Sequence, residues 1–288
     1  MATENITTSK DLIAQSIDFT EQFTGSISTL LQALSVTRMQ PMAVGSQIKI
    51  YKSEVNKADG NVAEGEVIPL SKATRKLSET KELAYKKYRK QTTAESIQAA
   101  GFGPAVNDTD SKLLRSIQGD IKKNFFDFVK TGTTKTTGAT FKKAVSSALG
   151  QLAIKWEDDD VQSVLFANPL DFYYYLFDTT VTTQSAFGLS YLQNFLGFNA
   201  IILTGAVDQG TVAATASQNL NYAYAAMNGS LTQAFNLTTD ETGLIGVAHT
   251  PVTENASYET LALTSGVLFP ERLDGIVVAT IGEASASK

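Results

Sequence analysis

KADGNVAEGEVIPLSKATRK, residues 57–76, is the stretch on which the architecture depends, because its composition does not suit a protein core. It carries charges of both signs, it is interrupted by glycines, and its apolar residues stand singly until Val67-Ile68-Pro69-Leu70. Apolar and polar residues alternate on either side of it, at Ile48 and Ile50 before it and at Leu83 and Tyr85 after it, which is typical of strands. The pattern predicts a long two-stranded hairpin with a polar tip. Because an isolated hairpin is marginally stable in water, we expect a neighbour to order it.

The charge of the chain is distributed unevenly around this hairpin. Residues 46–91 hold eleven basic and six acidic side chains, a local net charge of +5, whereas the whole chain carries −5 and the remainder therefore −10. Opposite potentials steer association, so the hairpin of one copy is suited to the acidic body of another. A solvated surface hairpin without a partner explains the charge pattern equally well.

Length and composition limit the class of protein. A chain of 288 residues with 43% hydrophobic and 18% charged residues is long enough for one large or two modest domains. It has no run of eighteen apolar residues and its N-terminus is polar, so neither a transmembrane span nor a secretory signal is expected. Without cysteine, stability must come from packing or assembly. A pI near 5.1 argues against a general nucleic-acid coat, which needs basic phosphate contacts.

The clearest helix is SKLLRSIQGDIKKNFFDFVKTG, residues 111–132, with Asp110 as its expected N-cap and Gly132 at its C-terminal stop. Apolar residues recur along it at three- and four-residue steps, so one face should pack on a core over roughly 30 Å. A short helix ended by Gly101 is expected before it, and a longer one from Phe141 to Trp156 after a flexible connection at residues 131–140.

Strands are expected mainly in the second half of the chain. They are predicted at residues 161–167, 198–204, 219–227, 259–265 and 275–281. A weak helical pattern covers residues 10–34, and residues 36–45 should form an extended connector. Helices grouped early and strands late predict an α+β fold rather than a regular βαβ repeat.

Motifs for catalysis or metal binding are weak. His249 is the only histidine, so a histidine-rich zinc site is excluded, and a Ser-His-Asp triad would lack the nucleophile elbow. The acidic run at residues 157–160 lacks EF-hand spacing and cannot direct four consecutive carboxylates at one calcium ion. The triplet Tyr173-Tyr174-Tyr175 offers an aromatic platform, but at helical spacing most of it should pack into the core. We expect no catalytic residue, no cofactor and no metal site, and hence no enzyme.

Several segments, in this order, resemble a known family. They are FTEQFTGSISTLLQALSVTRMQPMAVGSQIKIYK (19–52), VAEGEVIPLSK (62–72), KKYRKQTTAESIQAAG (86–101), DTDSKLL (108–114) and SGVLFPERLDGIVVATIGE (265–283). Together they are similar to the major capsid proteins of tailed bacteriophages, which have the HK-ninety-seven type of fold, and most of all to those from phages of Gram-positive hosts. The resemblance covers nearly the whole chain.

The resemblance implies a division of the chain. Residues 1–45 would be the N-terminal arm, 46–92 the extended E-loop, 93–135 the part of the P-domain that holds the spine helix, 136–235 the A-domain, and 236–288 the C-terminal strands of the P-domain. The E-loop would lie across a neighbouring subunit. Its candidate intersubunit contacts are Lys52, Lys57, Glu64, Glu66, Lys72, Arg75 and Lys76.

The resemblance also implies partners and a location. Copies would assemble through hexamers and pentamers into an icosahedral shell around double-stranded DNA, without sequence-specific binding. The protein would be made in the host bacterial cytoplasm and end in the virion, with a portal protein and, because only about 45 residues precede the hairpin, a separate scaffolding protein and little trimming. Covalent Lys–Asn cross-linking is not expected. A tail-tube subunit is the main alternative, and a small-molecule-binding protein or an enzyme with a pocket near Tyr173–Tyr175 or His249 is another.

Overall fold

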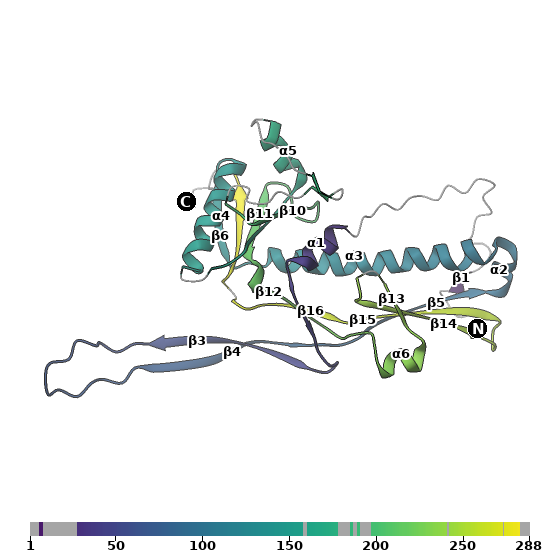
Figure 1. Ribbon diagram of the computed structural model, residues 1–288, viewed down its shortest axis with the longest axis horizontal. Coiled ribbons are helices and arrows are strands. Elements are labelled where there is room, and N and C mark those ends of the chain that lie inside the picture. Colours follow the sequence, from purple (N-terminus) through teal and green to yellow (C-terminus); the bar gives the residue numbers. More distant parts are fainter. Residues whose placement is uncertain are drawn as a thin grey trace, which may run out of the picture.

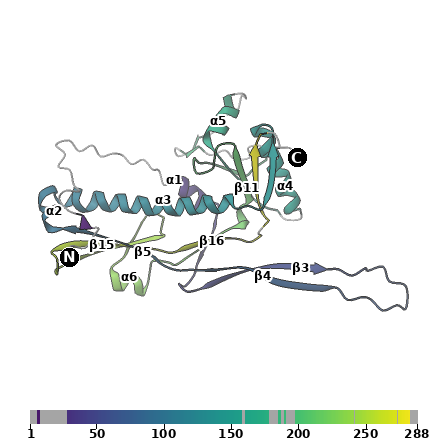
Figure 2. The same ribbon diagram turned by 180° about the vertical axis from the view of Figure 1, so that it is seen from behind.

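The structure, a computed structural model, describes residues 6–7, 28–157, 160–177, 185–186, 189–190, 197–240, 242–272 and 274–282. A long helix, α3 (Thr109–Lys130), runs beside an elongated sheet, and a lobe containing helices α4 (Phe141–Lys155) and α5 (Pro169–Phe177) stands at one end of it (Figure 1). The hairpin of strands β3 (Gln47–Asn56) and β4 (Lys72–Glu82) projects away from this body, and the reverse view in Figure 2 shows the same free-standing arm.

Shorter helices complete the helical part. They are α1 (Ser28–Ser35), α2 (Ala94–Ala100), α6 (Ser230–Phe235), a π-helical turn at Gly103–Asp108 and a 3₁₀ turn at Ser217–Asn219. Helix α2 begins after Thr93, whose side chain accepts a hydrogen bond from the Ser96 amide, and ends at Gly101, whose φ of 85° suits glycine. The short helix expected there is confirmed.

The elongated sheet has the strand order β1-β5-β15-β14-β13. Its members are β1 (Ile6–Thr7), β5 (Lys86–Thr93), β15 (Ser257–Thr264), β14 (Ile245–Val252) and β13 (Thr238–Thr239). Strand β15 is antiparallel to both β5 and β14, so segments about 170 residues apart in sequence lie side by side, as Ser257 opposite Thr93 shows.

The lobe is built on a second sheet, with the order β10-β7-β11-β17-β6. Its members are β10 (Ala200–Leu203), β7 (Ser163–Ala167), β11 (Thr211–Ala216), β17 (Ile276–Ile281) and β6 (Thr134–Gly138). A smaller sheet, β16-β12-β2, joins the two parts through β16 (Gly266–Pro270), β12 (Leu220–Tyr224) and β2 (Arg38–Pro41), and β8 (Ser185–Ala186) pairs with β9 (Leu189–Ser190).

The core lies on both faces of the second sheet. Along β7 every side chain is buried, and alternate residues face opposite ways: Val164 and Phe166 join the cluster that contains α3, whereas Leu165 and Ala167 join the cluster that contains α4. Phe166 meets Phe125 and Phe126 of α3 edge to face, with ring centroids 5.9 Å apart in both pairs. The apolar face of α3 is therefore fixed at its C-terminal half by the lobe.

Most of the elements expected from the sequence occur, with these corrections. Asp110 is not an N-cap, because the π-helical turn leads directly into α3 and Asp110 lies in its first turn. Residues 131–140 are not only a flexible connection, since they contain β6, which pairs in parallel with β17. Within residues 10–34, only 28–34 belong to the described part, and they lie in α1. The last strand, β17, lies in the sheet of the lobe, and the predicted domain boundaries stay a prediction.

Candidate assembly surface

The β3–β4 hairpin is an antiparallel ladder with one irregularity. Its register runs from Gln47 opposite Glu82 to Asn56 opposite Lys72, and it shifts between Ile50 and Tyr51, so that Ser78 is an extra residue on β4. A bulge of this kind bends and twists the ribbon. Residues 57–71 form the tip, where Asp59 accepts a hydrogen bond from the Asn61 amide at 3.0 Å. Strand β5 continues from the hairpin into the elongated sheet, so the freely projecting part of the chain ends near residue 82.

The root of the hairpin is fixed to the body. The Gly45 amide donates to the Leu83 carbonyl and the Leu83 amide to the Ser46 carbonyl, and the Leu83 side chain is fully buried. The Lys81 ammonium donates to the Leu268 carbonyl at 2.9 Å and lies 5.5 Å from the centre of the Phe128 ring on α3. The root is thus rigid relative to α3, whereas the strands beyond it have exposed side chains on both faces.

Four of the predicted contact residues lie on the strands. Lys52 is directly opposite Lys76, and Glu54 compensates this like-charge pair, with its carboxylate oxygens 3.5 Å from both ammonium groups. Arg75 lies over the Tyr51 ring, 4.0 Å from its centre. Lys72 begins β4.

The other three predicted residues, Lys57, Glu64 and Glu66, lie in the tip. They are exposed and form no ion pair with any residue that the structure describes. The structure therefore brings together the strand residues and leaves the tip charges without partners. Whether these residues contact another subunit stays a prediction.

Sequence reasoning missed the apolar side chains of the same arm. Val67, Ile68 and Leu70 at the tip are 92%, 73% and 95% exposed, and Val55 and Leu77 on the strands are 69% and 53% exposed. A row of large apolar side chains facing water marks an interaction site in a folded protein. The signal was present in the run Val67-Ile68-Pro69-Leu70, which has the composition of a buried segment but no core to enter.

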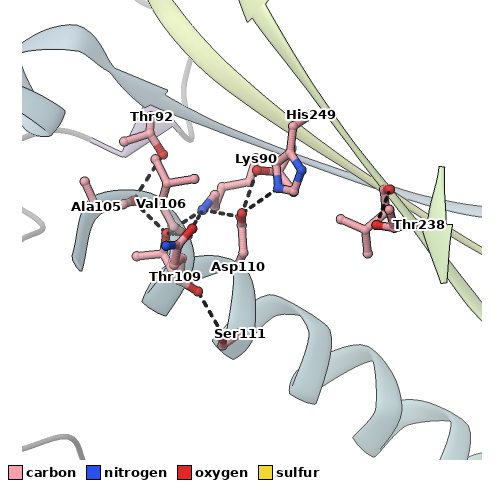
Figure 3. Close-up of polar contacts among 12 residues, drawn as sticks. Lys90, Thr92, Ala105, Val106, Thr109, Asp110, Ser111, Thr238 and His249 are labelled. Carbon is pink, nitrogen blue, oxygen red and sulfur yellow. Dashed lines mark hydrogen bonds and ion pairs between the residues drawn. The ribbon is translucent and has the colours of Figure 1, made fainter. Parts of the chain in front are cut away.

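A polar cluster ties α3 to the elongated sheet (Figure 3). Asp110 accepts hydrogen bonds from Thr260 at 2.8 Å and pairs with Lys90 at 2.5 Å, while its second oxygen lies 2.8 Å from His249 Nε2. Lys90 also donates to the Thr109 hydroxyl and, at 3.2 Å, to the Val106 carbonyl. This arrangement supplies a structural link between α3, β5, β14 and β15, in which His249 is held by a carboxylate of the same subunit.

The other candidate sites named from the sequence are the tyrosine triplet and the acidic run at residues 157–160. Tyr173 and Tyr174 are exposed on α5 and Tyr175 lies 5.5 Å from the Phe141 ring, so the expectation that most of the triplet is buried is wrong. Asp158 and Asp159 lie outside the described residues. Among those that are described, no group of three or more histidine, cysteine, aspartate or glutamate residues is arranged to hold a metal, and no helix is long and apolar enough to cross a membrane.

No protein-family model and no curated protein sequence matches the chain. Among solved structures, the capsid of cyanophage P-SCSP1u aligns with a TM-score of 0.62 at 8% identity, covering 86% of this chain and 87% of that one. The capsid of an empty GTA particle aligns with a TM-score of 0.60 at 10% identity, over 94% and 96% of the two chains. The encapsulin of the SrpI complex from Synechococcus elongatus also reaches 0.60, at 11% identity over 93% and 90%.

Likeness at these identities concerns the fold, and it extends over most of the chain. The α+β class expected from the sequence is confirmed, and so is the architecture that the resemblance implied. The chain has the major capsid protein fold of tailed phages, which the encapsulin shares.

Proposed function

We propose that the protein is the structural subunit of a phage head shell, in which copies assemble through hexamers and pentamers around double-stranded DNA. The observation that carries the proposal is the β3–β4 hairpin, an arm fixed at its root and exposed along its length, in a chain whose fold matches shell proteins. An exposed two-stranded ribbon with large apolar residues at its tip gains stability only on another surface.

The same reasoning supports the predicted division of the chain into domains. Residues 93–135, which contain α3, and residues 236–288 form the P-domain, residues 136–235 form the A-domain, and residues 46–92 form the E-loop that lies on a neighbouring subunit. Copies in hexamers and pentamers meet at slightly different angles, and a ribbon joined to a rigid body through one root adapts to this more readily than two interlocking surfaces do. A portal protein and a separate scaffolding protein would complete the assembly.

A second candidate is a protein compartment without a genome, because one of the matching structures is an encapsulin. Both candidates predict a closed shell and differ in its contents. A tail tube, the alternative weighed from the sequence, is less suited to a chain that aligns with shell proteins over most of its length.

The test is to express the chain alone and with its neighbouring genes, and to separate the products by density-gradient sedimentation. A fast-sedimenting particle whose DNA resists nuclease supports the phage head. A particle that holds protein cargo and no protected DNA favours the compartment. A subunit that stays at the top of the gradient under both conditions contradicts the proposed assembly.

A further inference from the structure

A pocket of about 290 Å³ lies at the root of the hairpin, between α3 and the strands β12 and β16. Lys81 and Lys86 line it where β4 passes into β5, Phe128 and Asn124 line it from α3, and Leu268 lines it from β16. No acidic side chain lines the pocket. Lys81 is paired with Glu79 at 3.5 Å, so the uncompensated positive charge beside the apolar wall comes from Lys86.

Two exposed polar side chains of this pocket, Lys86 and Asn124, have no protein partner among the described residues of the subunit. Lys86 forms no ion pair or side-chain hydrogen bond with any described residue, and the same is true of the Asn124 amide. The buried Tyr222 side chain also lines the pocket. A phenol is neutral at physiological pH, so the Tyr222 hydroxyl can donate a hydrogen bond. An accessible ammonium group and hydrogen-bond donors beside apolar side chains are suited to a carboxylate ligand.

The tip of the hairpin has the complementary chemistry. Glu64 and Glu66 stand unpaired beside Val67, Ile68 and Leu70, the most exposed large apolar side chains of the arm. A subunit cannot place its own tip in its own pocket, because β3 and β4 hold ten and eleven residues and at 3.3 Å per residue separate the tip from the root by roughly 30 Å. Figure 1 shows the tip at the far end of the arm from β16.

We propose that the pocket at the hairpin root is a docking site for the acidic and apolar tip, residues 64–70, of a second copy of this chain. A glutamate of the incoming tip meets Lys86 and the Tyr222 hydroxyl, and an apolar residue beside it covers Phe128 and Leu268. Each copy then both donates a tip and receives one, a heterologous contact that closes into rings. The inference rests on the proposed shell and specifies which surface of the neighbour receives the arm.

Charge reversal tests the pairing. Glu66→Lys and Lys86→Glu, made singly, should each raise the protein concentration needed for assembly by about tenfold or more, because each places like charges in contact. The double variant Glu66→Lys with Lys86→Glu should assemble as the wild type does, since every copy carries both changes. The matched control is Glu66→Lys with Lys87→Glu, which has the same net charge but changes an exposed lysine that does not line the pocket. It should not restore assembly.

A cross-link gives a second readout, and the absence of cysteine makes the background clean. Shells of the Ile68→Cys, Val267→Cys variant should give a ladder of disulfide-linked chains on a non-reducing gel, whereas Ile68→Cys with Lys87→Cys should not, because a disulfide needs Cα atoms within about 7 Å. Folding of each variant is checked by circular dichroism of the unassembled subunit.

The outcomes separate the two proposals. If the wild-type protein forms no shells, the proposed function fails. If it forms shells but Lys86→Glu does not rescue Glu66→Lys, or the Val267 pair does not cross-link in them, the docking site is overturned while the shell stands. Equal rescue by Lys87→Glu also overturns it, because that result assigns the effect to net charge.

Discussion

At the scale of single residues, the close packing of Tyr222 against Gly266 leaves no room for a side chain at position 266. A Cβ added at Gly266 would lie 1.9 Å from the Tyr222 hydroxyl oxygen and 2.3 Å from its ring carbon Cζ. The two residues belong to paired strands, β12 and β16, at the junction of body and lobe. Glycine is therefore required here for close approach.

We expect Gly266→Ala to lower the free energy of unfolding of the unassembled subunit by about 1–3 kcal/mol, the usual cost of overpacking. The control is Gly119→Ala, on the exposed face of α3, where nothing lies within 4 Å of the added Cβ. There the change should stabilise by about 0.5–1 kcal/mol, because alanine is the better helix former. Denaturant unfolding measures both, and a Gly266→Ala protein as stable as the wild type would contradict the packing.

Tyr222 also gives the subunit an alkaline limit. Burial raises the pKa of its phenol from 10.0 to about 12, so the folded state keeps the proton to higher pH than the unfolded chain does. The stabilising contribution is complete below pH 10 and is lost as the pH rises through the window between 10 and about 12.

The loss assigned to this residue is about 2–3 kcal/mol across that window. Because other tyrosines and lysines titrate there too, the measurement is the difference in unfolding free energy between the wild type and Tyr222→Phe at pH 9 and at the alkaline end. The wild type should lose more stability than the variant. Equal losses would show that the phenol ionises as readily in the folded state.

At the scale of elements, the ion pair of Asp110 with Lys90 decides how the N-terminal end of α3 is held. The side chains of both residues are mostly buried, and Asp110 additionally accepts from Thr260. We expect Asp110→Ala to lower the free energy of unfolding by about 3 kcal/mol, since it leaves a buried ammonium without its counter-charge. Hydrogen exchange should become faster in the first turns of α3.

His249→Gln is the matched control, because the histidine contacts the same carboxylate from a more exposed position. It should cost less than about 1 kcal/mol. If the two variants prove equally stable, the buried pair is not what fixes the helix.

The elements also show what could be predicted from sequence. Helix α4 was predictable because its apolar periodicity determines which face is buried, and strand β7 because it is a short, continuous apolar run. Strand β6 was not, since TKTTG has no apolar alternation and becomes a strand only by pairing with β17, some 140 residues later. The Asp110 prediction failed for the same reason: the acidic residue fits a cap locally, but its partners come from β5 and β15.

The candidate site was predictable in part. Charge and glycine content predicted where the arm lies in the chain and which ionic residues it carries. The pairing of Glu54 with Lys52 and Lys76 could not be predicted, because it depends on the register of the ladder, which the sequence does not determine. The tyrosine triplet on α5 was misjudged because consecutive helical residues point about 100° apart, so three in a row cannot share one buried face.

At the scale of the whole molecule, we expect the body to determine the stability of the subunit and the arm to determine its assembly. Replacing residues 57–71 by Asn-Gly would close β3 and β4 with a two-residue turn between Asn56 and Lys72, which face each other in the register. The free energy of unfolding should change by less than about 0.5 kcal/mol, because the removed side chains are exposed. Assembly should be lost. Sedimentation of the folded variant gives the answer, and intact shells from it would show that the tip is dispensable.

Electron microscopy of the purified protein under assembly conditions tests most directly whether the protein forms a shell. We expect closed shells, or angular sheets of hexamers, in which the hairpin of each subunit lies on its neighbour. Open tubes of fixed diameter, or a discrete monomer at every concentration, would contradict it.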